Sequence, residues 1–302
     1  MAQNVTVQGA SYADVPAVVL PKTGGGTASF TDVSDTTAAA GDVASGKYFY
    51  TAAGQRTEGT ASGGGGQAYE DLLAVLAGTF SGAFANSDIT IIKGRGFSNC
   101  PNMTSLSLPN LTQTGDRPFD GTTNLTSINT PNITNAAGYY LTGQTHLSGG
   151  YIFPALTTCA AEFVSGATIT SIVVPALTSM GTNFANGNGA LVSADFTNLT
   201  KFMGWAFRNT TAFTTLILRK PSIIALDNVN VFVGSKFDSG GAGGTIYIPE
   251  SLYNHLGDGT SSDYKAATNW STVNAYGTIT WAKIEGSQYE NYYADGTPIP
   301  SS

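Results

Sequence analysis

The stretch LPNLT (108–112) decides the fold of this chain, because close variants of it return along the sequence at a nearly fixed distance. They read TPNIT (130–134), FPALT (153–157), VPALT (174–178) and FTNLT (196–200). Residues 110–112 also fit an N-glycosylation acceptor. The acceptor asparagine is, however, Ala155 and Ala176 in two of the copies, while the apolar and threonine positions persist. The motif therefore marks a repeated structural corner and not a set of sugar sites.

Three kinds of residue repeat with a period of about 22. The apolar residue of the motif recurs in steps of 22, 23, 21, 22 and 24 residues: Leu111, Ile133, Leu156, Leu177, Leu199 and Ile223. An aromatic residue follows seven or eight positions later: Phe119, Tyr140, Phe163, Phe184 and Phe207. Another apolar residue comes six or seven positions after that: Leu125, Leu147, Ile169, Leu191 and Phe213. A repeat of this length is typical of solenoid proteins.

One such repeat holds a strand and a return path, and it cannot bury its apolar face alone. A stack of repeats can, so we expect parallel strands that pair coil to coil around one column of core residues. Proline follows several of these strands, where a missing N–H is tolerated. The expected column is Leu106, Leu108, Ile128, Ile152, Ile172, Val174, Leu216 and Leu218. The predicted fold is mainly β, a solenoid of coils of about 22 residues.

The rest of the chain divides by composition. Residues 1–62 carry short β-like stretches (NVTVQ, AVVLP, ASFTDV and KYFYT), and the Gly-rich SGGGGQ (62–67) follows as a joint. AYEDLLAVLAG (68–78) predicts a helix that ends at Gly78, with Leu72, Leu73, Val75 and Leu76 on one apolar stripe. We therefore expect a β-rich N-terminal module (1–62), a joint with a short helix (63–83), the solenoid (84–243), and a C-terminal cap and tail (244–302).

Composition and charge exclude several classes of function. Only 11% of the residues are charged, the net charge is −7, and no cluster of lysine or arginine occurs, so nucleic acid is not an expected partner. The longest apolar window (72–84) is too short and Gly-rich to span a membrane, and the N-terminus does not read as a secretory signal. Cys100 and Cys159 occupy different places in the repeat, and we expect two buried thiols without a disulfide.

Residues 97–128, FSNCPNMTSLSLPNLTQTGDRPFDGTTNLTSI, resemble the BspA-type leucine-rich repeat at Phe97, Cys100, Met103, Leu106 and Leu108, with Pro109 and Phe119. Later repeats depart from that pattern, with the cysteine position assigned to Thr122, Gly166, Gly187 and Thr210. Residues 244–279 are similar to the closing unit of such arrays, a last strand followed by a helix. The resemblance covers about residues 84–282 and implies a leucine-rich-repeat solenoid with a C-terminal cap.

A second resemblance concerns DTTAAAGDVASGKYFYTAAGQRTEGTA (35–61), which looks like a short module of virion proteins in phages of Gram-positive bacteria. It implies an appendage or tail-fibre-like protein on the phage particle. By this resemblance, the N-terminal module contacts other virion proteins and forms a homo-oligomer, as a trimer. The solenoid would then contact a glycan or protein on the host surface.

Candidate catalytic groups are few, and we expect no catalytic, metal or cofactor site. GDVASGKY (41–48) imitates a phosphate-binding loop, but it lacks Ser or Thr after Lys47 and we read it as a turn. His146 and His255 have no visible partner in the sequence. Paired carboxylates could cut polysaccharide, and the acids that stacking could bring together are Asp116, Asp120, Glu162 and Asp195. We read them as separate solvated acids.

Aromatic residues outside the predicted core are the candidates for ligand binding, because aromatic faces stack on sugar rings. They are Tyr139, Tyr151, Trp205, Tyr289, Tyr292 and Tyr293. Each could equally be an ordinary packing residue. The sequence favours a non-enzymatic phage virion protein that displays a repeat domain for host binding. A bacterial cell-surface adhesin and a polysaccharide depolymerase stay as alternatives.

Overall fold

The computed structural model describes residues 3–7, 10–15, 17–21, 27–31, 48–50, 56–58 and 66–285. The chain divides into two compact units, residues 1–72 and 73–302. In the first unit the described strands form three antiparallel pairs. These pairs are β1 (Gln3–Val7) with β2 (Ala10–Val15), β3 (Ala17–Pro21) with β4 (Thr27–Thr31), and β5 (Tyr48–Tyr50) with β6 (Arg56–Glu58). Each predicted β-like stretch overlaps one of these strands, whereas β2 and β6 were not predicted.

Helix α1 (Gly66–Leu76) confirms the predicted helix, and Gly78 follows it with φ +72°. The predicted apolar stripe is wrong at two positions, because Leu73 and Leu76 are 41% and 60% exposed. Only Val75 is fully buried, and its carbonyl accepts a hydrogen bond from the Cys100 thiol at 3.1 Å. The last turn of the helix thus meets the first coil through one side chain and not through a stripe.

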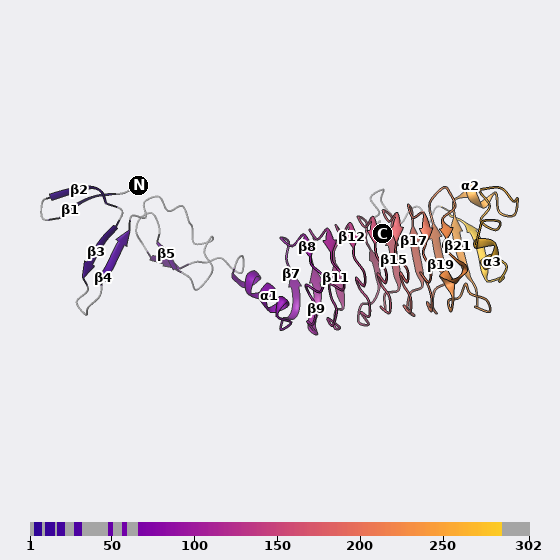
Figure 1. Ribbon diagram of the computed structural model, residues 1–302, viewed down its shortest axis with the longest axis horizontal. Coiled ribbons are helices and arrows are strands. Elements are labelled where there is room, and N and C mark those ends of the chain that lie inside the picture. The colour runs from indigo at the N-terminus through magenta and orange to yellow at the C-terminus, as the bar shows by residue number, and fades with distance from the viewer. Residues whose placement is uncertain are drawn as a thin grey trace. The chain divides into compact units, whose positions relative to one another are not determined.

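The second unit is a solenoid with two strand walls, which Figure 1 shows as strands lying side by side along the array. The longer strands are all parallel, and equivalent residues such as Leu106 and Ile128 or Ile172 and Ala194 pair across 22 positions. They are β7 (Ser81–Ala85), β9 (Asn102–Ser107), β11 (Ser127–Asn129), β13 (Gly150–Ile152), β15 (Ser171–Val174), β17 (Ser193–Phe196), β19 (Thr215–Leu218), β21 (Gly244–Ile248) and β22 (Ile279–Lys283). The predicted parallel stack is confirmed.

The second wall is built from strands of two residues. Five of them form one parallel sheet: β8 (Ile91–Ile92), β10 (Gln113–Thr114), β12 (Asn135–Ala136), β14 (Thr158–Cys159) and β16 (Ser179–Met180). Two more, β18 (Lys201–Phe202) and β20 (Ala225–Leu226), pair separately. None of the helices in the described residues is long and apolar enough to cross a bilayer.

The core between the walls follows the predicted marks. Apart from Ile223, the members of the three repeating classes are buried, and the aromatic row is continuous, with ring centroids 5.1 to 6.5 Å apart from Phe97 to Phe207. The one wrong assignment among these marks is Ile223, which is only half-buried, because the neighbouring Ile224 takes the core place. Both cysteines are buried and free, as predicted, and burial raises the pKa of Cys159 to about 12.

The register also differs from the prediction in the coil that contains β13. Tyr151 pairs with Ile172 and Phe153 is buried, so Ile152, which was expected in the column, lies on the other face of the strand. Compared with the coil before it, this coil has one additional residue before its strand, in the Gly149–Gly150 segment. Gly149 has φ +86°, and a side chain at Gly150 would meet the Ser171 hydroxyl at 2.3 Å. Among the described strands, β11 and β13 do not pair, so the longer wall is two sheets, β7–β9–β11 and β13 to β22.

The LPNLT corner is held by hydrogen bonds between coils. Its threonine hydroxyl donates to the carbonyl of the matching threonine one coil earlier, as in Thr134 to Thr112 at 2.9 Å and Thr157 to Thr134 at 2.9 Å. Its asparagine amide donates to a carbonyl of the preceding coil, as in Asn110 to Ser87 at 2.8 Å. The polar letters of the motif therefore join one coil to the next, and this satisfies backbone groups that would otherwise need water.

The cap closes the array with α2 (Glu250–Tyr253), α3 (Trp270–Asn274) and the edge strand β22. The last turn before it includes the short 3-10 helix η2 (Val229–Phe232). Two buried cap residues bond to the backbone of Ile224: its N–H donates to the Tyr264 hydroxyl at 2.9 Å, and its carbonyl accepts from Trp270 Nε1 at 2.7 Å. The predicted strand followed by a helix is present as β21 and α2, but β21 is not the last strand, because β22 pairs beyond it.

Candidate functional site

Two rows of residues with positive φ run along the return side of the solenoid, one residue of each row per coil. We call the first the outer row: Arg95, Arg117, Tyr139, Glu162, Asn183 and Trp205, with φ between 51° and 62°. The N–H of each of the first five donates to the carbonyl just before the next member, for example Tyr139 to Ala161 at 2.9 Å. We call the second the glycine row: Asn99, Gly121, Gly143, Gly166, Gly187, Asn209 and Gly234.

The glycine row corrects the alignment of the cysteine position. Gly166 and Gly187, which were expected to replace Cys100 in later repeats, are left-handed residues of this row. The residues that follow them, Ala167 and Asn188, take the cysteine place, since their N–H groups donate to the carbonyl three residues back as that of Thr122 does. In these coils a left-handed glycine immediately precedes the cysteine position, as Gly121 precedes Thr122, whereas Asn209 precedes Thr210.

The two rows differ in composition although their backbone conformation is the same. Left-handed φ is strained for residues with a Cβ, at a cost of about 1–2 kcal/mol each, and glycine avoids it. The glycine row holds only glycine and asparagine. The outer row holds no glycine in a chain that contains 37 of them. A strained position that keeps large polar and aromatic side chains is a candidate functional position.

Within the outer row, Arg117 and Tyr139 contact each other. The Arg117 guanidinium carbon lies 3.5 Å from the Tyr139 ring centroid, which is a close cation–π contact. Beside this pair lies a cleft of about 30 Å³, lined also by Asp120, Thr142 and Gln144. Gln144 is buried, and its Oε1 accepts no hydrogen bond from any described residue. The cleft has room for one or two water molecules or one hydroxyl group of a ligand.

Trp205 forms the other aromatic end of the row. Its side chain is 43% exposed, and the Arg208 guanidinium lies 5.8 Å from its ring centroid. Glu162 and Asn183, both half-buried, lie between it and Tyr139. Because stacked strands are about 4.8 Å apart, the three coil steps from Tyr139 to Trp205 span about 14 Å. Two of the predicted aromatics, distant in sequence, thus belong to one row with polar groups between them.

The other predicted aromatics are placed differently. Tyr151 lies in β13 at an inward strand position, where it packs against Phe153 with ring centroids 6.4 Å apart, and burial raises its pKa. This supports a packing role for Tyr151. Tyr289, Tyr292 and Tyr293 lie outside the described residues. Arg117 and Gln144 were not predicted as site residues, although aligning the repeats by 22 places Arg117 one coil before Tyr139.

The four carboxylates considered for hydrolysis do not contact one another. Asp116 accepts a hydrogen bond from the Gly138 N–H at 2.8 Å, and Asp120 lies 3.4 Å from Arg95. Asp195 is buried and bound by Arg219, with Nη2 2.7 Å from Oδ2. Glu162 belongs to the outer row. Each acid therefore has a different environment, and none is positioned by another.

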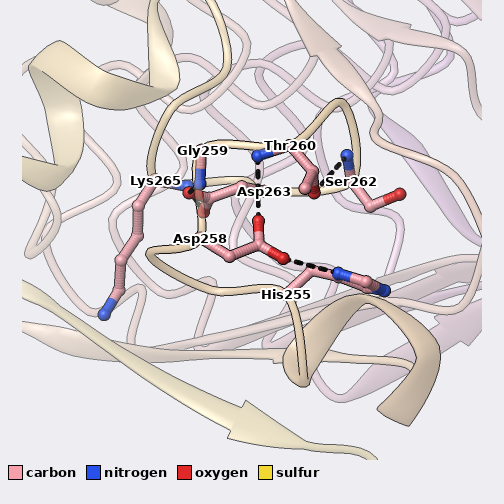
Figure 2. Close-up of polar contacts among 7 residues, drawn as sticks. All are labelled: His255, Asp258, Gly259, Thr260, Ser262, Asp263 and Lys265. Atoms are coloured by element: carbon pink, nitrogen blue, oxygen red, sulfur yellow. Dashed lines mark hydrogen bonds and ion pairs between the residues drawn. The ribbon is translucent and has the colours of Figure 1, made fainter.

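Both histidines have polar partners that were not visible in the sequence. The His146 ring donates to the Thr123 carbonyl at 2.8 Å. In the cap loop, His255 Nδ1 lies 2.7 Å from Asp258 Oδ2 (Figure 2). The N–H of Thr260 and the His255 ring lower the pKa of Asp258 to about 2. Within the described residues, no three His, Cys, Asp or Glu side chains are grouped so that they could hold a metal ion.

Comparison with known proteins agrees with this fold. Residues 80–191 match the BspA type leucine rich repeat region, in six copies. Residues 80–191 are thus similar to BspA-type leucine-rich repeats. No curated protein sequence matches this chain.

Two solved structures resemble it weakly. A leucine-rich repeat protein from Bacteroides ovatus is 11% identical with a TM-score of 0.40, over 69% of this chain and 61% of its own. A leucine rich cell surface protein from Faecalibacterium prausnitzii is 12% identical with a TM-score of 0.31, over 70% of this chain and 81% of its own. The chain spans less than two thirds of the length of the Bacteroides protein.

Proposed function

We propose that this chain, whose residues 80–191 are similar to BspA-type leucine-rich repeats, is a non-enzymatic binding protein that contacts a cell-surface glycan through the outer row. The observation that carries the proposal is the composition of that row. Five of six successive coils hold a residue strained in a conformation that glycine would adopt at no cost, and two of these five are aromatic; the sixth residue is Asn183, which tolerates this conformation. The side chains at these positions therefore have a role that offsets the strain.

The chemistry of the row favours a glycan over other surface ligands. Sugars present apolar ring faces and hydroxyl groups, and the row offers the exposed face of Trp205 and the part of the Tyr139 ring that Arg117 leaves uncovered. Polar groups of Glu162 and Asn183 lie between them, and the unpartnered Gln144 Oε1 would accept a hydroxyl hydrogen. An extended row of about 14 Å suits a short stretch of an extended polymer.

For the wider setting we propose a phage virion appendage of the tail-fibre type, on the resemblance of residues 35–61. The N-terminal module (1–62) would contact other virion proteins and form a trimer, and the solenoid would bind the host surface. Labelled antibody on imaged particles tests the location, and light scattering of the purified chain tests the trimer. Absence of the protein from particles would remove the virion setting and leave the outer-row proposal standing.

Two alternatives remain distinct from this one. A bacterial cell-surface adhesin is favoured by the BspA-type repeats themselves, and cell-surface fractionation of the producing bacterium would detect it. A depolymerase would release oligosaccharide from an isolated envelope. The substitutions Asp116→Asn and Asp120→Asn would abolish that release.

The outer-row proposal is tested with Tyr139→Gly and Trp205→Gly. Glycine removes the aromatic face and accepts φ near +60°, so we expect folded proteins that bind isolated envelope polysaccharide at least tenfold more weakly. Asn209→Gly is the matched control, because it lies in the glycine row with φ +57° and should bind like the parent chain. Unchanged binding in both aromatic variants would overturn the proposal.

A further inference from the structure

A second cavity lies in the cap, away from the outer row. Its volume is about 390 Å³, and its lining consists of Tyr253, Leu256, Lys265, Asn274, Ile279 and Trp281. These residues come from α2, α3, β22 and the loop between the helices. Small-ligand cavities usually measure about 300–1,000 Å³, so this one fits a ligand of one or two rings and not a polymer.

Trp281 gives the cavity a rigid aromatic wall. Its Nε1 donates to Asn274 Oδ1 at 2.9 Å. Its ring packs against Tyr264 and Trp270, with centroids 5.3 and 5.7 Å apart. Tyr264 and Trp270 are themselves fixed by their bonds to Ile224. The indole plane is therefore held in place before a ligand arrives, which lowers the entropy cost of binding.

Lys265 gives the cavity a cation that no described carboxylate neutralises by an ion pair. The acids nearest in the loop are engaged elsewhere: Asp258 binds His255 and the Thr260 N–H, and Asp263 accepts from the N–H groups of Gly259 and Lys265. Figure 2 shows the Lys265 side chain extending away from both carboxylates. Although the chain has a net charge of −7, the unpaired Lys265 ammonium favours a ligand that carries an anionic group.

We propose that the cap cavity binds a sugar that carries a carboxylate, with a ring face on Trp281 and the carboxylate on the Lys265 ammonium. Tyr253, which is 37% exposed, forms the outer aromatic edge, and the Asn274 amide is placed to meet a hydroxyl. Leu256 and Ile279 also line the cavity, but its accessible surface is mostly polar and therefore suits the hydroxyl groups of a sugar. This site extends the proposed glycan binding to an acidic sugar unit, but it uses none of the outer-row residues.

The test titrates the full chain with D-glucuronic acid and with D-glucose, which differ in the carboxylate. The indole N–H resonances of Trp205, Trp270 and Trp281 are followed by NMR. We expect glucuronate to shift the Trp281 resonance with a dissociation constant on the order of millimolar, and glucose to bind about tenfold more weakly. Lys265→Gln should weaken glucuronate binding about tenfold to the level of glucose. Lys93→Gln is the matched control, because Lys93 is also exposed and lies far along the solenoid.

Several outcomes would overturn the proposal. They are no shift of Trp281 with glucuronate, equal binding of glucuronate and glucose, and binding that Lys265→Gln leaves unchanged. Acetate that competes as well as glucuronate would reduce the cavity to a simple anion site and also refute the sugar. Tyr139→Gly and Trp205→Gly should leave this titration unaffected. A failure of the outer-row proposal is therefore distinguishable from a failure of this one.

Discussion

At the scale of single residues, Asp195 is a charged group placed where its neighbours are apolar. It lies in β17 between Val173 and Ile217 of the adjacent strands and is 4% exposed. Arg219 binds both carboxylate oxygens, with Nε 2.9 and 3.0 Å from them and Nη2 2.7 Å from Oδ2. Burial raises the pKa of Asp195 even though Arg219 lowers it. Burial therefore opposes ionisation of Asp195 more than the pairing with Arg219 favours it.

Replacing both partners should then be neutral or favourable. We expect the double variant Asp195→Val with Arg219→Leu to have the same free energy of unfolding as the parent chain, or one higher by up to about 3 kcal/mol. Asp195→Val alone should destabilise the chain, because Arg219 loses its bidentate partner. Urea unfolding of the three proteins measures this, and a double variant less stable than the single one would contradict it.

The pH dependence of stability should also show that ionised Asp195 destabilises the folded chain. An acid whose pKa is raised binds its proton more tightly in the folded chain than in the unfolded one. Asp195 ionisation therefore lowers stability as pH rises from 3.8 through the raised pKa. Over that window the double variant should gain stability relative to the parent chain.

The positions of some residues could be predicted from the sequence, whereas those of others could not. Apolar and aromatic marks such as Leu111 and Phe119 are fixed by burial, so the period alone predicted them. Ile152 was misplaced because side chains alternate between faces of a strand, and one added residue reverses them all. The Lys265 cavity depends on how the cap loop folds, and no local pattern encodes that.

At the scale of the coil, two turns with the same backbone conformation serve different ends. The glycine row permits the turn, whereas the outer row holds side chains at a cost. The 22-residue period predicted that a turn must exist in each coil. The period could not predict positive φ at the outer-row positions, because Arg, Glu and Trp rarely adopt the left-handed region.

This difference predicts opposite mutational effects. Gly187→Ala should lose about 1 kcal/mol, because alanine is strained at φ +72° while its Cβ has room, the nearest atom being 4.0 Å away. Glu162→Gly at φ +60° should be neutral or stabilising, since relief of strain opposes the added freedom of the unfolded chain. Thermal unfolding of both variants is the measurement. A large loss of stability in Glu162→Gly would show that its side chain packs structurally.

At the scale of the whole molecule, the solenoid depends on its neighbours coil by coil and on its cap at one end. Each coil contacts the next through strand pairing, the aromatic row and the threonine bonds. An internal coil is therefore replaceable in principle, whereas the cap residues Tyr264 and Trp270 serve backbone groups that no further coil would satisfy.

Two deletions separate these roles. Removing residues 172–193 joins equivalent positions, since Ile172 and Ala194 pair, and should give a soluble and shorter solenoid of lower stability. Removing residues 250–302 takes away α2, α3 and β22, opens the edge of β21, and should give aggregates. Size-exclusion chromatography with urea unfolding reads out both. A soluble and monodisperse capless chain would contradict the role assigned to the cap.

The missing pairing between β11 and β13 has a mechanical consequence. At most levels the coils are joined by strand ladders on both walls, but here the strand bonds are those of the short pair β12 and β14. The Tyr140 ring, 6.1 Å from Phe153, and the turn bonds from Tyr139 and Leu141 also cross this level. Because fewer strand hydrogen bonds cross between β11 and β13, a pull along the solenoid axis would put more force on each bond at this level. The array would therefore separate first at this level under tension.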